Sequence, residues 1–155
     1  MKWLAVDYGD SRTGLAGCDE SETVTSPITP QIEGKSMNKV AAAVVEAARA
    51  RQAAGLVCGL PKNMDGTEGK RAEKSRRFAQ RLADMAGMPV VMWDERRTTV
   101  SAAAILADND TFGQKRKEKL DSVSAAVILE SFLNWRAHHP GETAPEQLMP
   151  RQEQV

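Results

Sequence analysis

Three acidic residues lie at the ends of predicted secondary-structure elements: Asp7, Glu95 and Asp121. Asp7 lies near the end of an apolar run at 2–8, Glu95 ends the run VVMWDE, and Asp121 begins a helical pattern. In α/β sheets, ligands bind where strands end and helices begin, so three carboxylates that are distant in sequence can meet there. Two divalent cations held about 4 Å apart by acidic oxygens can activate a water molecule and neutralise a leaving oxygen. The pattern therefore predicts metal-dependent cleavage of a phosphodiester bond, with Mg²⁺ or Mn²⁺ as the cofactor.

Each of these carboxylates also has an ordinary structural role open to it. Asp7 can cap the turn that follows it or pair with Arg12. Asp94 precedes Glu95 directly, and adjacent strand residues point to opposite faces of a sheet. The alternation of side chains therefore leaves the middle member of the site open between Asp94 and Glu95.

The segment 59–69, GLPKNMDGTEG, joins a short apolar strand to a basic helix. Its backbone amides and the N-terminus of the following helix are suited to binding a phosphate. The alternative is a plain connection, which is the commoner use of such residues. Because eleven residues is long for a connection, the segment favours a binding role.

A second candidate loop is DERRTT at 94–99. One of its two arginines can contact the scissile phosphate bidentately while the other braces the fold, and Thr98 or Thr99 can cap the next helix. The predicted contacts to the substrate are Arg12, Asn63, Asp65, Gly66, Thr67, Arg96 and Thr98.

These residues must be positioned by a hairpin-rich start followed by alternating helices and strands. The patterns predict strands at 2–8, 13–19, 23–29, 56–61 and 90–95, and helices at 36–53, 69–86, 98–107 and 121–136. The expected class is α/β, with a mixed central sheet flanked by helices in a single domain. We expect that domain to span 1–137, and the Pro- and Gln-rich residues 138–155 to form a disordered tail.

The composition is that of a globular protein, and charge is distributed unevenly along it. The chain has 155 residues, with 21 basic and 21 acidic side chains and a net charge of zero. Basic residues gather at 70–81 and 115–119, which are either polyanion-binding surfaces or solvated helix faces. No run is long enough for a membrane span, and two isolated cysteines fit a reduced cytoplasm. We therefore expect a cytoplasmic protein with no membrane partner.

Four blocks of sequence together resemble the YqgF/RuvX family: VDYGDSRTGLA at 6–16, GLPKNMDGTEG at 59–69, DERRTT at 94–99 and LDSVSAAVILESFL at 120–133. The resemblance implies an RNase H-like fold. It also implies that Asp7, Glu95 and Asp121 are the acidic catalytic positions, and so favours Glu95 over Asp94. The family is described both as a nuclease that matures the 5′ end of precursor 16S rRNA and as a Holliday junction resolvase.

The leading hypothesis is a metal-dependent nuclease for structured RNA, in which Asp7 bridges two metal ions. The first alternative is a junction-cleaving enzyme for branched DNA, which should be a two-fold dimer. The second is a non-catalytic RNA-binding factor for ribosome assembly. The segment DYGDSRTG also resembles the first phosphate loop of actin-like ATPases and sugar kinases. This function is disfavoured because such enzymes bind ATP between two domains, and 155 residues make only one. We expect a monomer or a weak homodimer, and the sequence leaves the choice between RNA and DNA open.

Overall fold

The computed structural model describes residues 1–98 and 114–151, and of residues 114–121 it describes the backbone alone. The predicted helix at 98–107 therefore lies almost wholly outside the described residues. The elements are β1 (Trp3–Asp7), β2 (Arg12–Cys18), β3 (Thr25–Glu33), α1 (Met37–Ala50), β4 (Gly55–Leu60), α2 (Lys70–Ala86), β5 (Val90–Asp94), the 3-10 turn η1 (Glu95–Arg97), α4 (Gln114–His138) and β6 (Gln147–Leu148).

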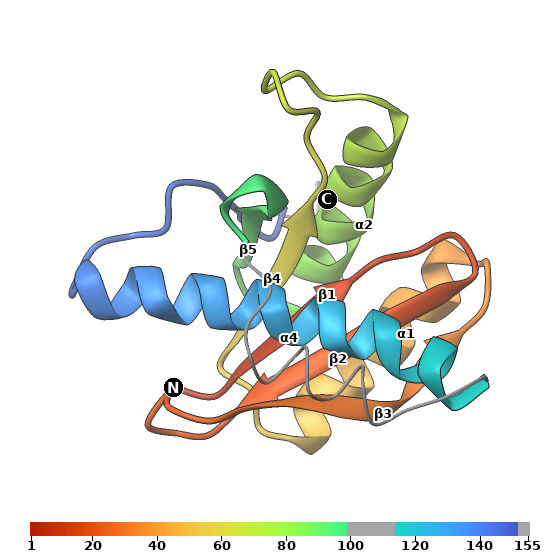
Figure 1. Cartoon of the computed structure of the whole chain (residues 1–155), viewed down its shortest axis with the longest axis horizontal. Coiled ribbons are helices and arrows are strands. Elements are labelled where there is room, and N and C mark those ends of the chain that lie inside the picture. The colour runs from red at the N-terminus through yellow and green to blue at the C-terminus, as the bar shows by residue number, and fades with distance from the viewer. Residues whose placement is uncertain (99–113, 152–155) are drawn as a thin grey trace.

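The strands form one mixed sheet in the order β3-β2-β1-β4-β5-β6. The three central strands, β1, β4 and β5, are parallel, while β2, β3 and β6 pair antiparallel with their neighbours. Helices α1 and α2 cover one face and α4 crosses the other (Figure 1). Because parallel strands end on the same side, β1, β4 and β5 present their carboxyl ends together.

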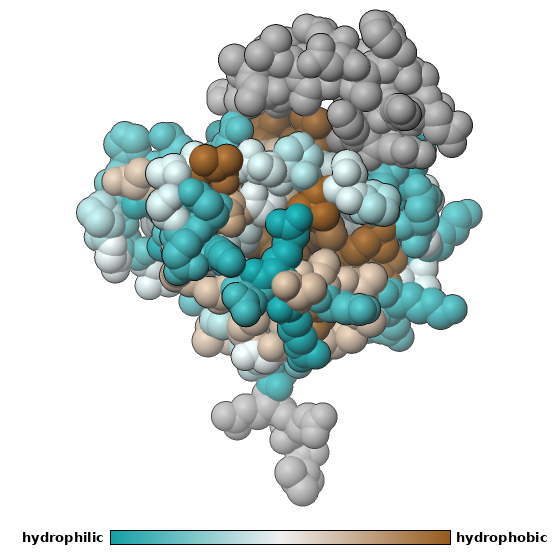
Figure 2. Space-filling model, turned by 90° about the horizontal axis from the view of Figure 1, so that it is seen from below, coloured by the Kyte–Doolittle hydropathy of each residue, from teal (hydrophilic) through white to brown (hydrophobic). Residues whose placement is uncertain are grey.

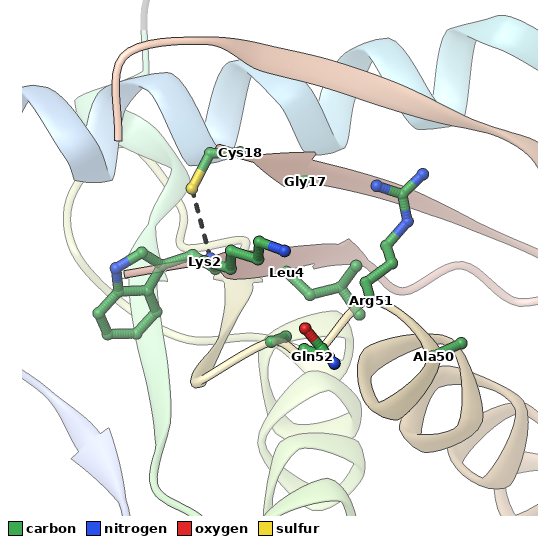
Figure 3. A pocket seen from close by; sticks show the side chains of 9 residues that line it. Lys2, Leu4, Gly17, Cys18, Ala50, Arg51 and Gln52 are labelled. Atoms are coloured by element: carbon green, nitrogen blue, oxygen red, sulfur yellow. Dashed lines mark hydrogen bonds between the residues drawn. The ribbon is translucent and has the colours of Figure 1, made fainter. Parts of the chain in front are cut away.

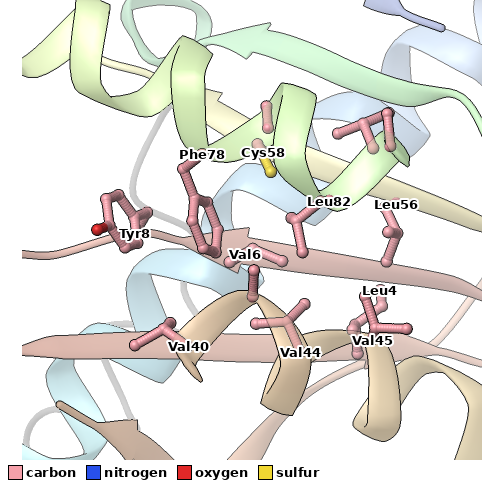
Figure 4. Packing of buried hydrophobic residues seen from close by; sticks show 14 of the residues in the cluster. Leu4, Val6, Tyr8, Val40, Val44, Val45, Leu56, Cys58, Phe78 and Leu82 are labelled. Atoms are coloured by element: carbon pink, nitrogen blue, oxygen red, sulfur yellow. The ribbon is translucent and has the colours of Figure 1, made fainter. Parts of the chain in front are cut away.

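Alternating side chains of the central strands build a separate core on each face of the sheet. Leu4 and Val6 of β1 pack against α1 and α2, where Val44 and Phe78 are fully buried (Figure 4). On the other face, Trp3 meets the ring of Phe132 of α4 edge-on at 4.9 Å between centroids. The strands are buried on both sides, which explains why their sequences are apolar runs.

The β3 strand continues through two prolines. The predicted strand ended at the breakers Pro27 and Pro30, but the observed strand extends to Glu33. Proline lacks a backbone N–H, and β3 lies at the edge of the sheet, where one side of the strand needs no partner. The edge position therefore tolerates residues that a central strand would not.

The C-terminal segment is folded as far as Arg151, contrary to the predicted disorder from residue 138. After α4 the chain returns along the sheet (Figure 1), and β6 pairs with β5. Arg151 donates from Nη2 to Asp84 at 2.7 Å, and Gln80 of α2 donates to the carbonyl of Met149 at 2.8 Å. The segment thereby covers the outer edge of β5.

The surface of the described part carries few large apolar side chains. Those exposed are Met1, Val24, Met64, Met85 and Met149. Hydrophilic side chains cover much of the face shown in Figure 2, with apolar ones gathered near its middle. None of the helices in the described ranges has the length and apolar character that a membrane crossing requires.

Candidate active site

Two of the predicted carboxylates lie on opposite sides of a glycine at the carboxyl end of the sheet. Asp7 is the last residue of β1 and comes one step after the Val6–Cys58 pair, which places it level with Gly59 of β4. Glu95 begins the turn directly after β5, whose Trp93 pairs with Gly59. The register of three parallel strands therefore brings residues 7 and 95 to one place.

Gly59 provides the space that Glu95 occupies. A Cβ atom at position 59 would lie 3.1 Å from the Glu95 Cδ and 2.7 Å from the Ile128 Cδ1 of α4. The Glu95 side chain therefore lies over Gly59 on the face that α4 covers. Asp7 belongs to the same face, because alternation along β1 groups it with Trp3 and Ala5, which pack against α4.

Asp94 and Glu95 have different surroundings. This difference distinguishes the two residues, which the alternation of strand side chains could not do. Asp94 accepts hydrogen bonds from the Arg96 side chain, at 2.8 Å from Nη2, and from the Arg96 backbone N–H at 3.0 Å. The Arg96 hydrogen bonds hold the pKa of Asp94 below its usual value. Asp94 thus caps η1 and is paired with a cation.

Glu95 is half-buried, and none of the described side chains forms a hydrogen bond or ion pair with its carboxylate. Burial raises its pKa above the usual value; the charge of Arg71 opposes this shift and that of Asp94 adds to it. A carboxylate that is withdrawn from water but lacks a close cation is suited to binding a metal ion. This geometry separates a structural Asp94 from an available Glu95.

The third predicted carboxylate is on α4. Residue 121 is within the helix, but its side chain lies outside the described residues. Helical spacing places position 121 on the stripe of Ala125, Ile128 and Phe132, all buried against the sheet. The described side chains, which do not include that of residue 121, form no group of three potential metal ligands.

The loop between β4 and α2 projects beyond the rest of the sheet (Figure 1). Its polar side chains bond mainly to one another: Asn63 donates to the Thr67 hydroxyl at 2.9 Å, and that hydroxyl donates to Asp65 at 2.6 Å. Gly66 has a φ of 89°, which permits the turn, and its N–H donates to the Asn63 carbonyl. The predicted contact residues of this loop therefore shape the loop itself.

The remaining predicted contacts are placed around the same end of the sheet. Arg96 connects Asp94 to the loop, donating to the Met64 carbonyl at 3.4 Å, and thus acts as the brace. The Thr98 hydroxyl donates to the Glu95 carbonyl at 2.6 Å and closes η1. Arg12 begins β2, and alternation groups it with Gly14, the partner of Asp7, on the face that α4 covers.

Arg71 is a candidate that the sequence patterns did not single out. It lies in the first turn of α2, is exposed, and its charge acts on both Glu95 and Asp10. One turn further along, Lys74 forms a 2.7 Å ion pair with Asp10. Much of the remaining basic run at 70–81 is structural, since Arg76 pairs with Glu68 and Glu146. The side chains of the second basic run, 115–119, lie outside the described residues.

A cationic pocket lies at the opposite end of the sheet. Lys2 and Arg51 line it together with Cys18, whose thiol accepts a hydrogen bond from the Trp3 N–H at 3.3 Å (Figure 3). Its volume is about 240 Å³. Because it adjoins the start of β1 and Asp7 ends that strand, the pocket is separate from the carboxylates.

Known proteins resemble this chain in fold and, separately, in sequence. A Thermus thermophilus RuvC structure in complex with a Holliday junction substrate aligns with a TM-score of 0.62 at 14% identity, covering 90% of this chain and 96% of that one. A second RuvC structure from the same organism aligns with a TM-score of 0.55 at 13% identity and covers 89% and 97%. The fold is therefore RNase H-like, as predicted, with carboxylates at the carboxyl end of its parallel strands.

The sequence comparison is more specific than the fold. The RuvX family, described as Holliday junction resolvase, matches residues 1–135. A Symbiobacterium thermophilum protein described as a candidate pre-16S rRNA nuclease is 38% identical over 143 residues, covering 92% of this chain and 99% of its own length. A Myxococcus xanthus protein of the same description is also 38% identical over 143 residues, covering 92% and 93%. The chain belongs to the RuvX family.

Proposed function

We propose that this protein is a metal-dependent nuclease that cleaves phosphodiester bonds while processing the 5′ end of precursor 16S rRNA. The description of the relatives supports this substrate, since they match the chain over nearly all of their length. The function implies a cytoplasmic protein whose partner is structured RNA. Asp7, Glu95 and Asp121 are its proposed catalytic and metal-binding residues.

One observation carries the proposal: Asp7 and Glu95 flank Gly59 on one face of the sheet, at the carboxyl end of its parallel strands. Ligands of open α/β sheets bind in this position. The neighbouring Asp94 is already paired with Arg96, so Glu95 is the carboxylate left available.

The residues present fit a divalent cation such as Mg²⁺ or Mn²⁺. Asp7 and Glu95 offer the hard oxygen donors that these ions prefer, and the absence of a side chain at Gly59 leaves room for the Glu95 carboxylate. When bound, such cations lower the pKa of water and neutralise charge on the leaving oxygen, and a pair of them forms the proposed two-metal site. Asp7, Glu95 and Asp121 would together hold such cations.

Cationic side chains of this chain would orient the substrate. Arg12 begins β2, and Arg71 acts on Glu95 from the first turn of α2; both are proposed to bind phosphate oxygens on either side of the cleaved bond. Arg96 connects the loop at 61–69 to Asp94, which caps η1. Asn63, Asp65, Gly66 and Thr67 keep the loop in the shape that its exposed backbone presents to the RNA.

The test compares Asp7→Asn and Glu95→Gln with a matched control, Asp84→Asn, which removes a carboxylate paired with Arg151 away from the site. We expect both site variants to lose at least about a hundredfold in cleavage of a precursor 16S RNA in Mg²⁺, with unchanged circular dichroism spectra. Asp84→Asn should cleave as the wild type does. Full activity of Asp7→Asn in Mg²⁺ would contradict the assignment.

A second candidate function, cleavage of Holliday junctions, is favoured by the description of the family. It predicts a two-fold dimer that makes paired nicks. Cleavage of a four-way DNA junction and of precursor 16S RNA, measured at the same salt concentration, separates the two functions. RNA binding without any metal-dependent cleavage would instead indicate a non-catalytic assembly factor.

A further inference from the structure

A second pocket lies beside β5, at its outer edge. We call it the edge pocket, and it is lined by Lys62, Met92, Trp93, Asp94, Arg97, Pro145 and Glu146. Its volume is about 340 Å³, within the roughly 300–1,000 Å³ usual for ligand sites. It is therefore large enough to hold part of a nucleotide.

The charges of the edge pocket do not cancel. Both of its carboxylates are already paired with arginines outside its lining, Asp94 with Arg96 and Glu146 with Arg76. Lys62 and Arg97, in contrast, form no ion pair with any side chain that the structure describes. The pocket thus presents two available cations and no available anion.

Arg97 lines the pocket beside the ring of Trp93. Its Cζ lies 5.2 Å from the centroid of the Trp93 ring, and its carbonyl accepts a hydrogen bond from Ser131 of α4 at 3.1 Å. The same hydroxyl accepts a 2.9 Å hydrogen bond from the Trp93 indole N–H. The contact with the Trp93 ring restricts the Arg97 side chain, which reduces the entropy lost when its guanidinium binds an anion.

The edge pocket adjoins the candidate active site. Asp94 caps η1, which begins with Glu95, and Arg97 is its last residue. Lys62 comes two residues after Leu60, the partner of Asp94 in the sheet. A nucleic-acid strand that leaves the carboxylates toward the β5 edge would therefore reach this pocket first.

We propose that the edge pocket binds a backbone phosphate of the substrate strand beside the cleaved bond, through Lys62 and Arg97. A planar guanidinium and an ammonium group together match the oxygens of a phosphate, and contacts of this kind fix the register of a strand. The proposal rests on the proposed nuclease function. It also completes the division of labour between the two arginines of 94–99: Arg96 braces the fold, and Arg97 contacts the substrate.

The outer wall of the edge pocket comes from the C-terminal segment. Pro145 and Glu146 lie beyond residue 135, where the family match ends. The Glu146 carbonyl accepts a hydrogen bond from the Met92 N–H at 2.9 Å, which fixes the segment against β5. This wall therefore limits where the strand can pass, independently of the shared family blocks.

The test measures binding of uncleaved precursor RNA in an Asp7→Asn background, with Lys62→Ala and Arg97→Ala as the variants. The matched control is Arg77→Ala, which removes an exposed cation of α2 that does not line the pocket. We expect each pocket variant to weaken binding about tenfold and to reduce the slope of log K against log salt by about 0.7 to 0.9. Arg77→Ala should change binding by less than about twofold.

A second measurement locates the phosphate. Single methylphosphonate linkages are placed in turn along the RNA, and the linkage whose neutralisation weakens binding should lie next to the cleaved bond. In Lys62→Ala that position should lose its effect while the others keep theirs. Pocket variants that behave like Arg77→Ala, or a scan without such a position, would overturn the proposal. Because the scan reads binding alone, failure of cleavage would count against the proposed function and leave this result separate.

Discussion

Gly59 and its neighbours show how one missing side chain shapes the candidate site. The position lies between Asp7 and Trp93 in the register of the sheet, and its α-carbon faces both Glu95 and Ile128. Any side chain here would compete with Glu95 for the same space. The carboxylate therefore depends on a glycine for its placement as much as on the turn that begins with it.

We predict that Gly59→Ala lowers activity and stability together. The new Cβ would lie 2.7 Å from Ile128 Cδ1 and 3.1 Å from Glu95 Cδ, so the neighbours must move. Overpacking of this kind costs about 1 to 3 kcal/mol in free energy of unfolding, and displacing a metal ligand by about 1 Å can cost roughly a hundredfold in rate. Urea unfolding and precursor RNA cleavage measure the two effects.

The matched control for this substitution is Gly17→Ala in β2. Its nearest neighbour would be the flexible end of Arg51 at 3.3 Å, at the opposite end of the sheet from the carboxylates. It should therefore leave activity unchanged. Equal activity of Gly59→Ala and the wild type would show that Glu95 does not need its observed place.

The sequence proposed the carboxylates of the candidate site but did not show how they are held. Asp7 follows from its place at the end of an apolar strand. The choice of Glu95 over Asp94 came from the family resemblance, because it depends on a 3-10 turn of three residues that no periodicity announces. Arg71 was missed because an exposed arginine in a basic helix looks the same whether or not it approaches a site.

The secondary-structure elements were predicted most reliably where their side chains carry the information. Helix α2 was predicted at 69–86 and runs from Lys70 to Ala86, since its apolar stripe is regular and Gly87 ends it with a φ of 70°. β6 was missed because it has two residues and pairs through its backbone. A short strand that pairs through its backbone at a sheet edge needs no particular side chains, so the amino-acid sequence does not indicate it.

We predict that Leu148→Ala destabilises the protein while Met149→Ala does not. Leu148 is partly buried and packs against the core under α1 and α2, whereas Met149 is 56% exposed. Loss of the Leu148 contacts should lower the free energy of unfolding by about 1 to 2 kcal/mol, and loss of Met149 by less than about 0.5 kcal/mol. Urea unfolding of both variants makes the comparison. Two equal and negligible effects would mean that the C-terminal segment is disordered in solution after all.

In the molecule as a whole, the residues of the candidate site are separate from the residues that stabilise the fold. Each face of the sheet has its own apolar core, and these cores close without help from the carboxylates at the end of β1 and β5. With a net charge of zero, the protein has no overall field that would draw in a polyanion. Recognition of a polyanion must therefore come from local groups, and the proposed ones are the carboxylates and the cations around them.

This division predicts that metal ions stabilise the protein without being required for its fold. A chelator should leave the circular dichroism spectrum of the wild type unchanged, because none of the described core depends on a metal.

Added Mg²⁺ should bind the folded state alone and raise the free energy of unfolding by about 2.7 kcal/mol at a hundredfold excess over Kd. For a chain of this size, that is a rise of roughly 5 to 10 °C in Tm. Asp84→Asn should show the full rise, since its carboxylate accepts hydrogen bonds from Arg151 and Gln80 away from the candidate site. Asp7→Asn and Glu95→Gln should each lose most of it, because each removes an oxygen donor while leaving both cores intact. An equal rise in Asp7→Asn and the wild type would place the cation elsewhere on the molecule, whatever the cleavage assays show.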